Sequence, residues 1–205
     1  MQNRVDPFGE IFETKARGLW MGNRGNLHNK EGKIVRAFKS KAWITCKLEF
    51  NGRKRHIMTP GFYTELFFLD EATAFAAGHR PCFECRREDY NRFKSAWLKG
   101  NPRYKFTDKT SIQEIDDIIH RERINRNGLK NTHTENNTDL PDGSFITENN
   151  HTYLLFKRHL YLWTPSGYTQ CKRFKAAGKS TVLTPASVLN AFRAGYTPQI
   201  DLTGI

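Results

Sequence analysis

The chain has 205 residues, of which 38% are hydrophobic and 26% are charged, and this composition is typical of a globular rather than a disordered protein. The length allows one buried core with elaborations and excludes two full-sized domains. The sequence contains no apolar run of membrane-spanning length, and its first residues lack the apolar centre of a signal peptide. We therefore expect a cytoplasmic protein that is not associated with a membrane.

The net charge of +12 is concentrated at the two ends of the chain. Residues 1–60 hold 13 Lys and Arg against 5 Asp and Glu, and residues 151–205 hold 7 against 1, whereas residues 61–150 hold 13 against 15. Basic segments of this kind suit a polyanionic partner, because phosphate contacts supply most of the non-specific affinity for nucleic acid. An ordinary solvated basic surface agrees equally well with the charge alone.

The first 70 residues predict strands. Alternating patterns favour strands over 33–38, 43–50 and 53–58, and Asn51-Gly52 is the residue pair that a tight hairpin turn requires. Cys46 shares a face of its predicted strand with Ile44, so we expect its side chain to point inward. An aromatic-rich apolar run predicts another strand over 62–69.

Helices are predicted in the middle of the chain and at its end. Asp70 can cap a short helix over 71–77, Pro81 can begin a helix over 82–100, and Ser111 with Glu114 forms a capping box for a helix over 111–126. The polar segment 127–143 is predicted as a loop or linker. Short strands over 144–148, 152–157 and 160–164 and a helix over 184–195 complete the chain.

These elements predict an α+β protein with an N-terminal antiparallel sheet, central helices that carry a CxxC motif, and C-terminal short strands with a closing helix. We expect residues 1–126 to form the basic sheet and the helical core, 127–143 to connect, and 144–205 to be a β-rich portion packed on the same domain.

Cys82 and Cys85 form the CxxC motif and can supply two of the four ligands of a tetrahedral zinc ion. Cys46 is a candidate third ligand, although an isolated strand cysteine is also common as a small buried hydrophobe. A zinc deaminase would need a glutamate two residues after an upstream ligand, and neither Cys46 nor His56 is followed by one. The segment AAGKST lacks the first glycine of a P-loop, because Arg173 occupies that position.

The segment DEATAFAAGHRPCFECRRE, with the preceding TELFF, resembles the zinc-binding segment of the Ada-type DNA-repair proteins. In that family a strand, a short helix and RPCxxC follow in this order, and the two cysteines bind zinc together with upstream cysteines. The resemblance implies that Cys82 and Cys85 are zinc ligands, and His79 stands where the family has an aromatic residue. The segment GNRGNLH is similar to the opening of nuclease-associated versions of the module, which implies His28 as a further ligand.

Several polar side chains are candidates for catalysis or for contacts with nucleic acid. Glu65 is the acid within an apolar run, His79 lies beside the motif, and His120 follows Asp116 by one helical turn, an arrangement that suits general acid or base chemistry. The side chains expected to contact phosphates are basic and flank turns or the CxxC motif: Arg24, Arg53, Lys54, Arg55, Arg80, Arg86 and Arg87.

The sequence thus predicts a protein that acts on nucleic acid, DNA rather than RNA, and that uses a structural zinc site to organise a basic surface. A DNA-repair or DNA-processing enzyme is the specific expectation. Two alternatives stay open: a non-catalytic, zinc-stabilised DNA-binding or regulatory module, and a hydrolase that uses Glu65 or His120 while the CxxC motif is only structural.

Overall fold

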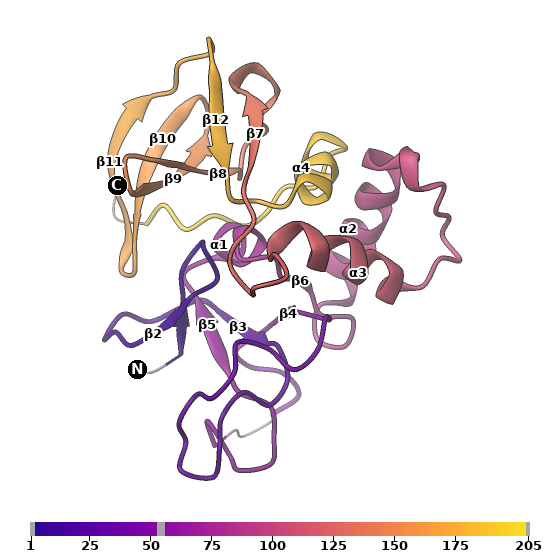
Figure 1. The fold of residues 1–205 in the computed structure, drawn as a ribbon, viewed down its shortest axis with the longest axis vertical. Coiled ribbons are helices and arrows are strands. Elements are labelled where there is room, and N and C mark those ends of the chain that lie inside the picture. Colours follow the sequence, from indigo (N-terminus) through magenta and orange to yellow (C-terminus); the bar gives the residue numbers. More distant parts are fainter. Residues whose placement is uncertain (1–2, 53–55, 204–205) are drawn as a thin grey trace.

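The computed structural model describes residues 3–52 and 56–203, which form two β-sheets and four α-helices. Figure 1 shows the N-terminal sheet at one end, the C-terminal sheet at the other, and the helix α1 (Glu71–Ala76) between them. The predicted α+β class is confirmed. In the described part of the chain, no helix combines the length and the apolar character that crossing a membrane requires.

The N-terminal sheet has six strands in the order β2-β1-β5-β3-β4-β6. Most neighbours pair antiparallel, as predicted, but β1 pairs with β5 and β4 pairs with β6 in parallel. The strands are β1 (Arg4–Val5), β2 (Ile11–Phe12), β3 (Trp20–Asn23), β4 (Ile44–Cys46), β5 (Leu66–Phe68) and β6 (Arg80–Pro81).

The strands of this sheet are shorter than their sequence patterns indicate. Residues 33–38 make a single bridge, between Ile34 and His28, and β4 ends at Cys46 rather than at residue 50. Asn51 and Gly52 have φ values of 51° and 66°, which is the left-handed geometry expected of the predicted turn. The predicted strand over 53–58 falls partly on residues 53–55, which lie outside the described residues.

Local capping explains where the helices begin and end. The side chain of Asp70 accepts hydrogen bonds from the backbone N and Oγ1 of Thr73 at 2.8 and 2.7 Å, and Gly78 follows α1 with a φ of 88°. The capping box of Ser111 and Glu114 is present as predicted. The other helices are α2 (Arg87–Gly100), α3 (Ile112–Arg123) and α4 (Ala186–Arg193), with 3-10 turns η1 (Pro102–Tyr104) and η2 (Asn137–Asp139).

The C-terminal sheet is antiparallel, with the strand order β11-β10-β9-β8-β12-β7. The predicted loop 127–143 contains β7, which pairs with β12 at the sheet edge. This polar strand alternates between half-buried and exposed residues, so it carries no apolar signal. The strands are β7 (His133–Asn136), β8 (Phe145–Glu148), β9 (His151–Phe156), β10 (His159–Thr164), β11 (Gly167–Arg173) and β12 (Lys179–Val182).

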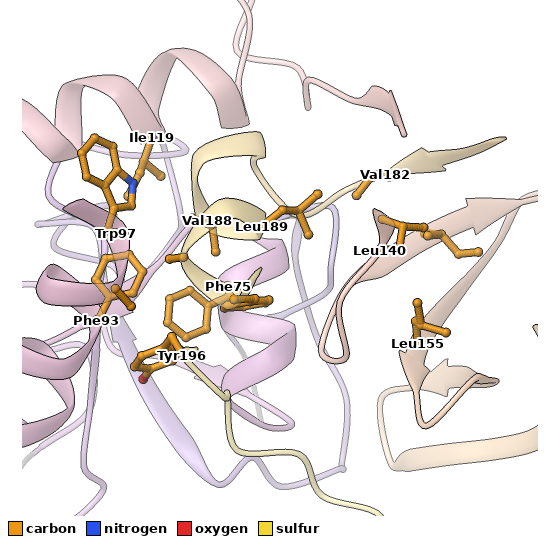
Figure 2. Packing of buried hydrophobic residues seen from close by; sticks show 14 of the residues in the cluster. Phe75, Phe93, Trp97, Ile119, Leu140, Leu155, Val182, Val188, Leu189 and Tyr196 are labelled. Carbon is orange, nitrogen blue, oxygen red and sulfur yellow. The ribbon is translucent and has the colours of Figure 1, made fainter. Parts of the chain in front are cut away.

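The largest hydrophobic core joins the four helices to the C-terminal sheet. Figure 2 shows Phe75 of α1, Phe93 of α2 and Tyr196 packed together, with Leu189 of α4 on the side toward Val182 of β12, and Leu155 of β9 farther out in the same cluster. Residues before 127 and after 143 therefore bury their apolar surface against one another. The domain boundaries themselves stay a prediction.

Candidate functional site

Three cysteines from two distant segments come together where β4 pairs with the edge strand β6 of the N-terminal sheet. The parallel pairing of β4 with β6 places Thr45 opposite Pro81, and the backbone N of Cys82 donates to the carbonyl of Thr45 at 2.9 Å. Cys46 thereby meets the CxxC turn, and the sulfur atoms of Cys46, Cys82 and Cys85 all lie within 4.8 Å of one another. Each cysteine is only 6% exposed.

The helix α2 begins five residues later than predicted, because the CxxC motif itself forms a turn. Residues 83–85 are in a turn, and the N–H of Arg86 closes it by donating to the carbonyl of Cys82 at 3.1 Å. A turn brings both sulfurs of a CxxC to one side, which a regular helix would not do as well. The motif therefore faces Cys46 rather than continuing into the helix.

The three thiols share hydrogen bonds that favour the thiolate form of one of them, Cys82. Hydrogen bonds from Cys46 and Cys85, together with nearby backbone N–H groups, lower the pKa of Cys82 despite its burial. The pKa of Cys46 is raised, because its thiol donates to Cys82 and is itself buried. One sulfur is thus set up as a thiolate, the form in which cysteine binds metal.

Cys46, Cys82 and Cys85 can hold a metal ion, and within the described chain no other Cys, His, Asp or Glu joins their group. The predicted ligand His28 is engaged elsewhere: its Nδ1 lies 2.6 Å from Thr64 Oγ1 and its Nε2 lies 3.2 Å from the carbonyl of Thr59. The structure therefore brings together three of the four predicted ligands.

Three of the arginines predicted to contact nucleic acid are buried inside the protein, and two of them, Arg80 and Arg86, form internal ion pairs. Arg80 makes a bidentate ion pair with Asp116 through Nε and Nη2, with both N···O distances 2.7 Å. Its Nη1 donates to the carbonyl of Pro81. Arg86 pairs with Glu71 at 2.5 Å and with Asp89 at 2.8 Å. Because their donors are used within the fold, these side chains hold the CxxC turn against α1 and α3 rather than forming a binding surface.

The other predicted basic residues differ in their surroundings. Arg87 is exposed, and its guanidinium carbon lies 4.1 Å from the ring centroid of Phe83, which is itself 49% exposed. Arg53, Lys54 and Arg55 lie outside the described residues. Arg24 is 1% exposed, because it is buried beside Trp43 and His79.

A cluster of aromatic and basic side chains surrounds Trp43, and we call Arg24, Trp43, His79, His120 and Arg123 the Trp43 cluster. The guanidinium carbons of Arg24 and Arg123 lie 3.9 and 3.7 Å from the centroid of the Trp43 ring. Arg24 follows β3, Trp43 precedes β4, His79 precedes β6, and His120 and Arg123 come from the last turn of α3. The structure thus brings together three predicted site residues that lie far apart in the sequence.

Both histidines of the Trp43 cluster are kept neutral by burial and by their arginine neighbours. Arg24 Nε donates to His79 Nε2 at 3.2 Å, and His120 Nδ1 lies 2.7 Å from Arg123 Nη2 and must accept, because arginine only donates. Burial and the two arginines lower the pKa of His79 well below its usual value. Burial and Arg123 lower the pKa of His120 to about 4.

The acids predicted for catalysis have structural partners. Asp116, expected to orient His120, is paired with Arg80, so His120 takes its orientation from Arg123 instead. Glu65 is 5% exposed and accepts a hydrogen bond from the backbone N of Met58 at 2.9 Å, where the chain has a φ of 60°. Glu65 therefore supports a strained turn, and the roles of Glu65, His79 and His120 in catalysis stay predictions.

The sequence did not identify Arg123 as a site residue, and it did not identify Arg80 as the partner of Asp116. Gly78 is the sequence feature related to Arg123, since a β-carbon at this position would lie 2.4 Å from Arg123 Cδ.

Comparisons with models of known protein families, with curated proteins and with solved structures gave no match.

Proposed function

We propose that the protein binds zinc through Cys46, Cys82 and Cys85 and that this metal centre stabilises a nucleic-acid-binding protein, with DNA the preferred partner. The observation that carries the proposal is the convergence of three buried cysteine sulfurs within 4.8 Å, although Cys46 and Cys82 are 36 residues apart. Thiolates are the ligands that structural zinc prefers. A reducing cytoplasm would keep these thiols available for metal.

The surroundings of the three cysteines suit a structural role for the metal. The site joins the end of β4 to the turn that precedes α2, and these two segments also meet through the short β4–β6 pairing and through a hydrogen bond from Arg86 Nη1 to Thr45 Oγ1. A metal ion bound there would stabilise the folded chain, because its ligands come together only on folding. Three thiolates leave the fourth zinc position to water or to a ligand from outside the cysteine group.

The surface that supports nucleic-acid binding lies on the C-terminal sheet. A groove of about 690 Å³ borders β8, β11 and β12, and four exposed basic side chains line it: Lys172, Arg173, Lys175 and Lys179. Glu148 is the acid in this lining, and it pairs with Lys172. A basic groove next to polar strands suits a phosphate backbone, which is recognised by charge rather than by sequence.

The metal proposal is tested by elemental analysis of the purified protein. We expect one zinc ion per chain in the wild type, loss of most of it in Cys82→Ser and in Cys46→Ser, and full retention in Cys171→Ser, since Cys171 is exposed on β11 and outside the group. Absence of stoichiometric metal in the wild type would overturn the proposal. Loss with Cys82→Ser but not with Cys46→Ser would remove Cys46 from the ligand set.

The nucleic-acid proposal is tested by binding to a short DNA duplex and to the RNA duplex of the same sequence over a range of salt concentrations. The triple variant of Lys172, Lys175 and Lys179 to Gln should weaken binding and flatten its salt dependence, by about 0.9 in the log–log slope for each lost phosphate contact. The matched control changes three exposed lysines near α2 and α3 to Gln: Lys99, Lys105 and Lys109. Equal effects of the two triple variants would contradict a role for the groove.

A further inference from the structure

A second cavity, of about 380 Å³, opens beside the Trp43 cluster and away from the cysteine centre. Three stretches of chain form its walls: residues 8–11 before and in β2, residues 34–38, and residues 124–130 after α3. Arg24 and Trp43 also line it. We call this cavity the Arg24 pocket.

Arg24 is buried at the wall of this pocket with one donor unused. Its Nε donates to His79 and its Nη1 donates to the carbonyl of Gly9 at 2.9 Å, while Nη2 is buried without a hydrogen-bond partner. A β-carbon on Gly9, which lines the pocket, would lie 3.5 Å from Nη2. A buried guanidinium nitrogen left unpaired is costly, so Nη2 at this wall indicates a missing acceptor.

The charge of the pocket is positive, and the protein supplies no carboxylate partner for it. Lys130 lines the pocket, and its Nζ donates one N–H to the carbonyl of Ala76, so two N–H groups are left for other acceptors. Arg36 adds an exposed guanidinium at the rim. Within the described residues, no Asp or Glu oxygen lies within 4.0 Å of the nitrogens of Arg24 or Lys130.

The acids nearest to this charge do not neutralise it. Glu10 lines the pocket with an exposed side chain, and the carboxylate of Asp6 accepts the backbone N of Glu10 at 2.9 Å. Burial and the neighbouring Arg123 and Arg24 lower the pKa of Lys130 to about 7, and burial lowers the pKa of Arg24 to about 9 despite Asp6. Burial is the largest cause of both shifts, and Asp6, which raises the pKa of both groups, offsets only part of it.

We propose that the Arg24 pocket binds a phosphate monoester, with the phosphate held by Arg24 and Lys130 and the organic group against the apolar wall. A monoester carries up to two negative charges and three acceptor oxygens, so it matches more than one cation better than a single carboxylate does. The volume exceeds that of a phosphate, and the apolar wall is formed by Phe8, Ile34, Phe38 and Leu129. The source is either a small phosphorylated molecule or the phosphorylated end of a nucleic-acid strand.

The proposal is independent of the metal centre, and calorimetric titration of the zinc-loaded protein tests it. The probes are inorganic phosphate, a nucleoside 5′-monophosphate and the matching nucleoside without phosphate. We expect the two phosphate-bearing probes to bind the wild type and the nucleoside not to bind. Failure of both phosphate-bearing probes to bind at millimolar concentration would overturn the proposal.

Substitutions of the pocket's cations test whether the phosphate binds in the Arg24 pocket. Lys130→Met and Arg24→Met should each weaken binding of the nucleoside monophosphate at least tenfold, whereas Arg121→Met, which removes an exposed cation from α3, should not. Because Arg24 is buried, Lys130→Met decides the matter if Arg24→Met does not fold, and circular dichroism reports whether each variant is folded. Unchanged affinity in Lys130→Met would place the phosphate elsewhere and overturn the proposal.

Two oligonucleotides distinguish the sources of the phosphate. A strand with a 5′-phosphate that binds at least tenfold tighter than the same strand with a 5′-hydroxyl, and that loses this advantage in Lys130→Met, would identify the strand end as the ligand. Equal binding of the two strands, with the nucleoside monophosphate still bound, would identify a small phosphorylated molecule. Loss of zinc binding in the cysteine variants has no bearing on either result.

Discussion

The cysteine centre and the Trp43 cluster are built on the same pair of short strands, yet they have opposite chemistry. Arg80 N donates to the carbonyl of Trp43, and two residues further along each strand Cys82 N donates to the carbonyl of Thr45. One end of this ladder thus carries sulfurs that bind a cation when deprotonated, and the other carries buried arginines that need an anion. A ladder of two hydrogen bonds thus separates a group of metal-binding thiols from a cluster of buried cations.

The separation of the two sites depends on how β6 is anchored. Arg80 lies in β6, between His79 of the cluster and the CxxC motif, and its ion pair with Asp116 ties the strand to α3. Arg86 ties the far side of the CxxC turn to Glu71 of α1. Buried ion pairs contribute little net stability, but loss of one partner leaves an uncompensated buried charge.

The largest expected effect comes from Asp116→Ala, which should disturb both sites together. Arg80 is 5% exposed and would be left unpaired, so we expect the free energy of unfolding to fall by about 3–5 kcal/mol. Urea denaturation measures this change, and zinc content together with Trp fluorescence reports the two sites.

The neighbouring residue provides the control for this substitution. Asp117 forms an ion pair with Lys41 at 2.9 Å in which both side chains are well exposed, so Asp117→Ala should cost less than about 1 kcal/mol. Equal losses for the two alanine variants would show that the Arg80 pair is not the anchor of β6.

A smaller and more selective effect is expected from Gly78→Ala, which should disturb the Trp43 cluster alone. The new β-carbon would lie 2.4 Å from Cδ and 2.8 Å from Cβ of Arg123, and Gly78 has a φ of 88°. Strain and overpacking together should lower the free energy of unfolding by about 2–4 kcal/mol. Zinc content at low denaturant should stay at the wild-type level.

Gly128→Ala is matched to this variant, because Gly128 has a φ of 77° but no atom within 4 Å of the added carbon. It should therefore cost only the backbone strain, about 1 kcal/mol. If the two glycine variants lose the same stability, contact with Arg123 is not what position 78 requires.

The two sites also differ in how far the sequence predicts them. Cys82, Cys85 and an inward-facing Cys46 could be recognised because a CxxC spacing and strand alternation are local signals. The parallel pairing that joins them could not, since β6 spans only two residues and has no periodicity. The Trp43 cluster was even less visible, because Arg24 and Arg123 are buried by tertiary contacts that no local pattern encodes.

Because local patterns do not encode tertiary contacts, the sequence also led to some wrong predictions for the strands and for the basic surface. The capping box at Ser111 and the helix after Asp70 were predicted because both rest on residues a few positions apart. Strand β7 was missed because its polar residues pair at an edge. Arg80 and Arg86 look like surface cations in the sequence, and only the positions of Asp116 and Glu71 in the fold show that they are internal.

The smallest expected effect concerns His120, whose protonation at low pH would add a positive charge to the Trp43 cluster. His120 has a pKa of about 4 in the folded chain, below the ordinary value of 6.5, so the unfolded chain binds more protons between these two pH values. Stability from this group is therefore present above pH 6.5 and is lost as the pH falls toward 4. Since the ring is partly exposed, solvent screening reduces the expected loss to about 1 kcal/mol.

His120→Gln should remove this part of the pH profile, because a glutamine oxygen can accept from Arg123 without titrating. The measurement is the free energy of unfolding of the metal-free protein at intervals between pH 4 and 7, taken as the difference from the wild type. His151→Gln, at an exposed position on β9, should leave the profile unchanged. A wild-type profile that persists in His120→Gln would mean that His79, more deeply buried between Arg24 and Phe68, carries the acid sensitivity of the cluster.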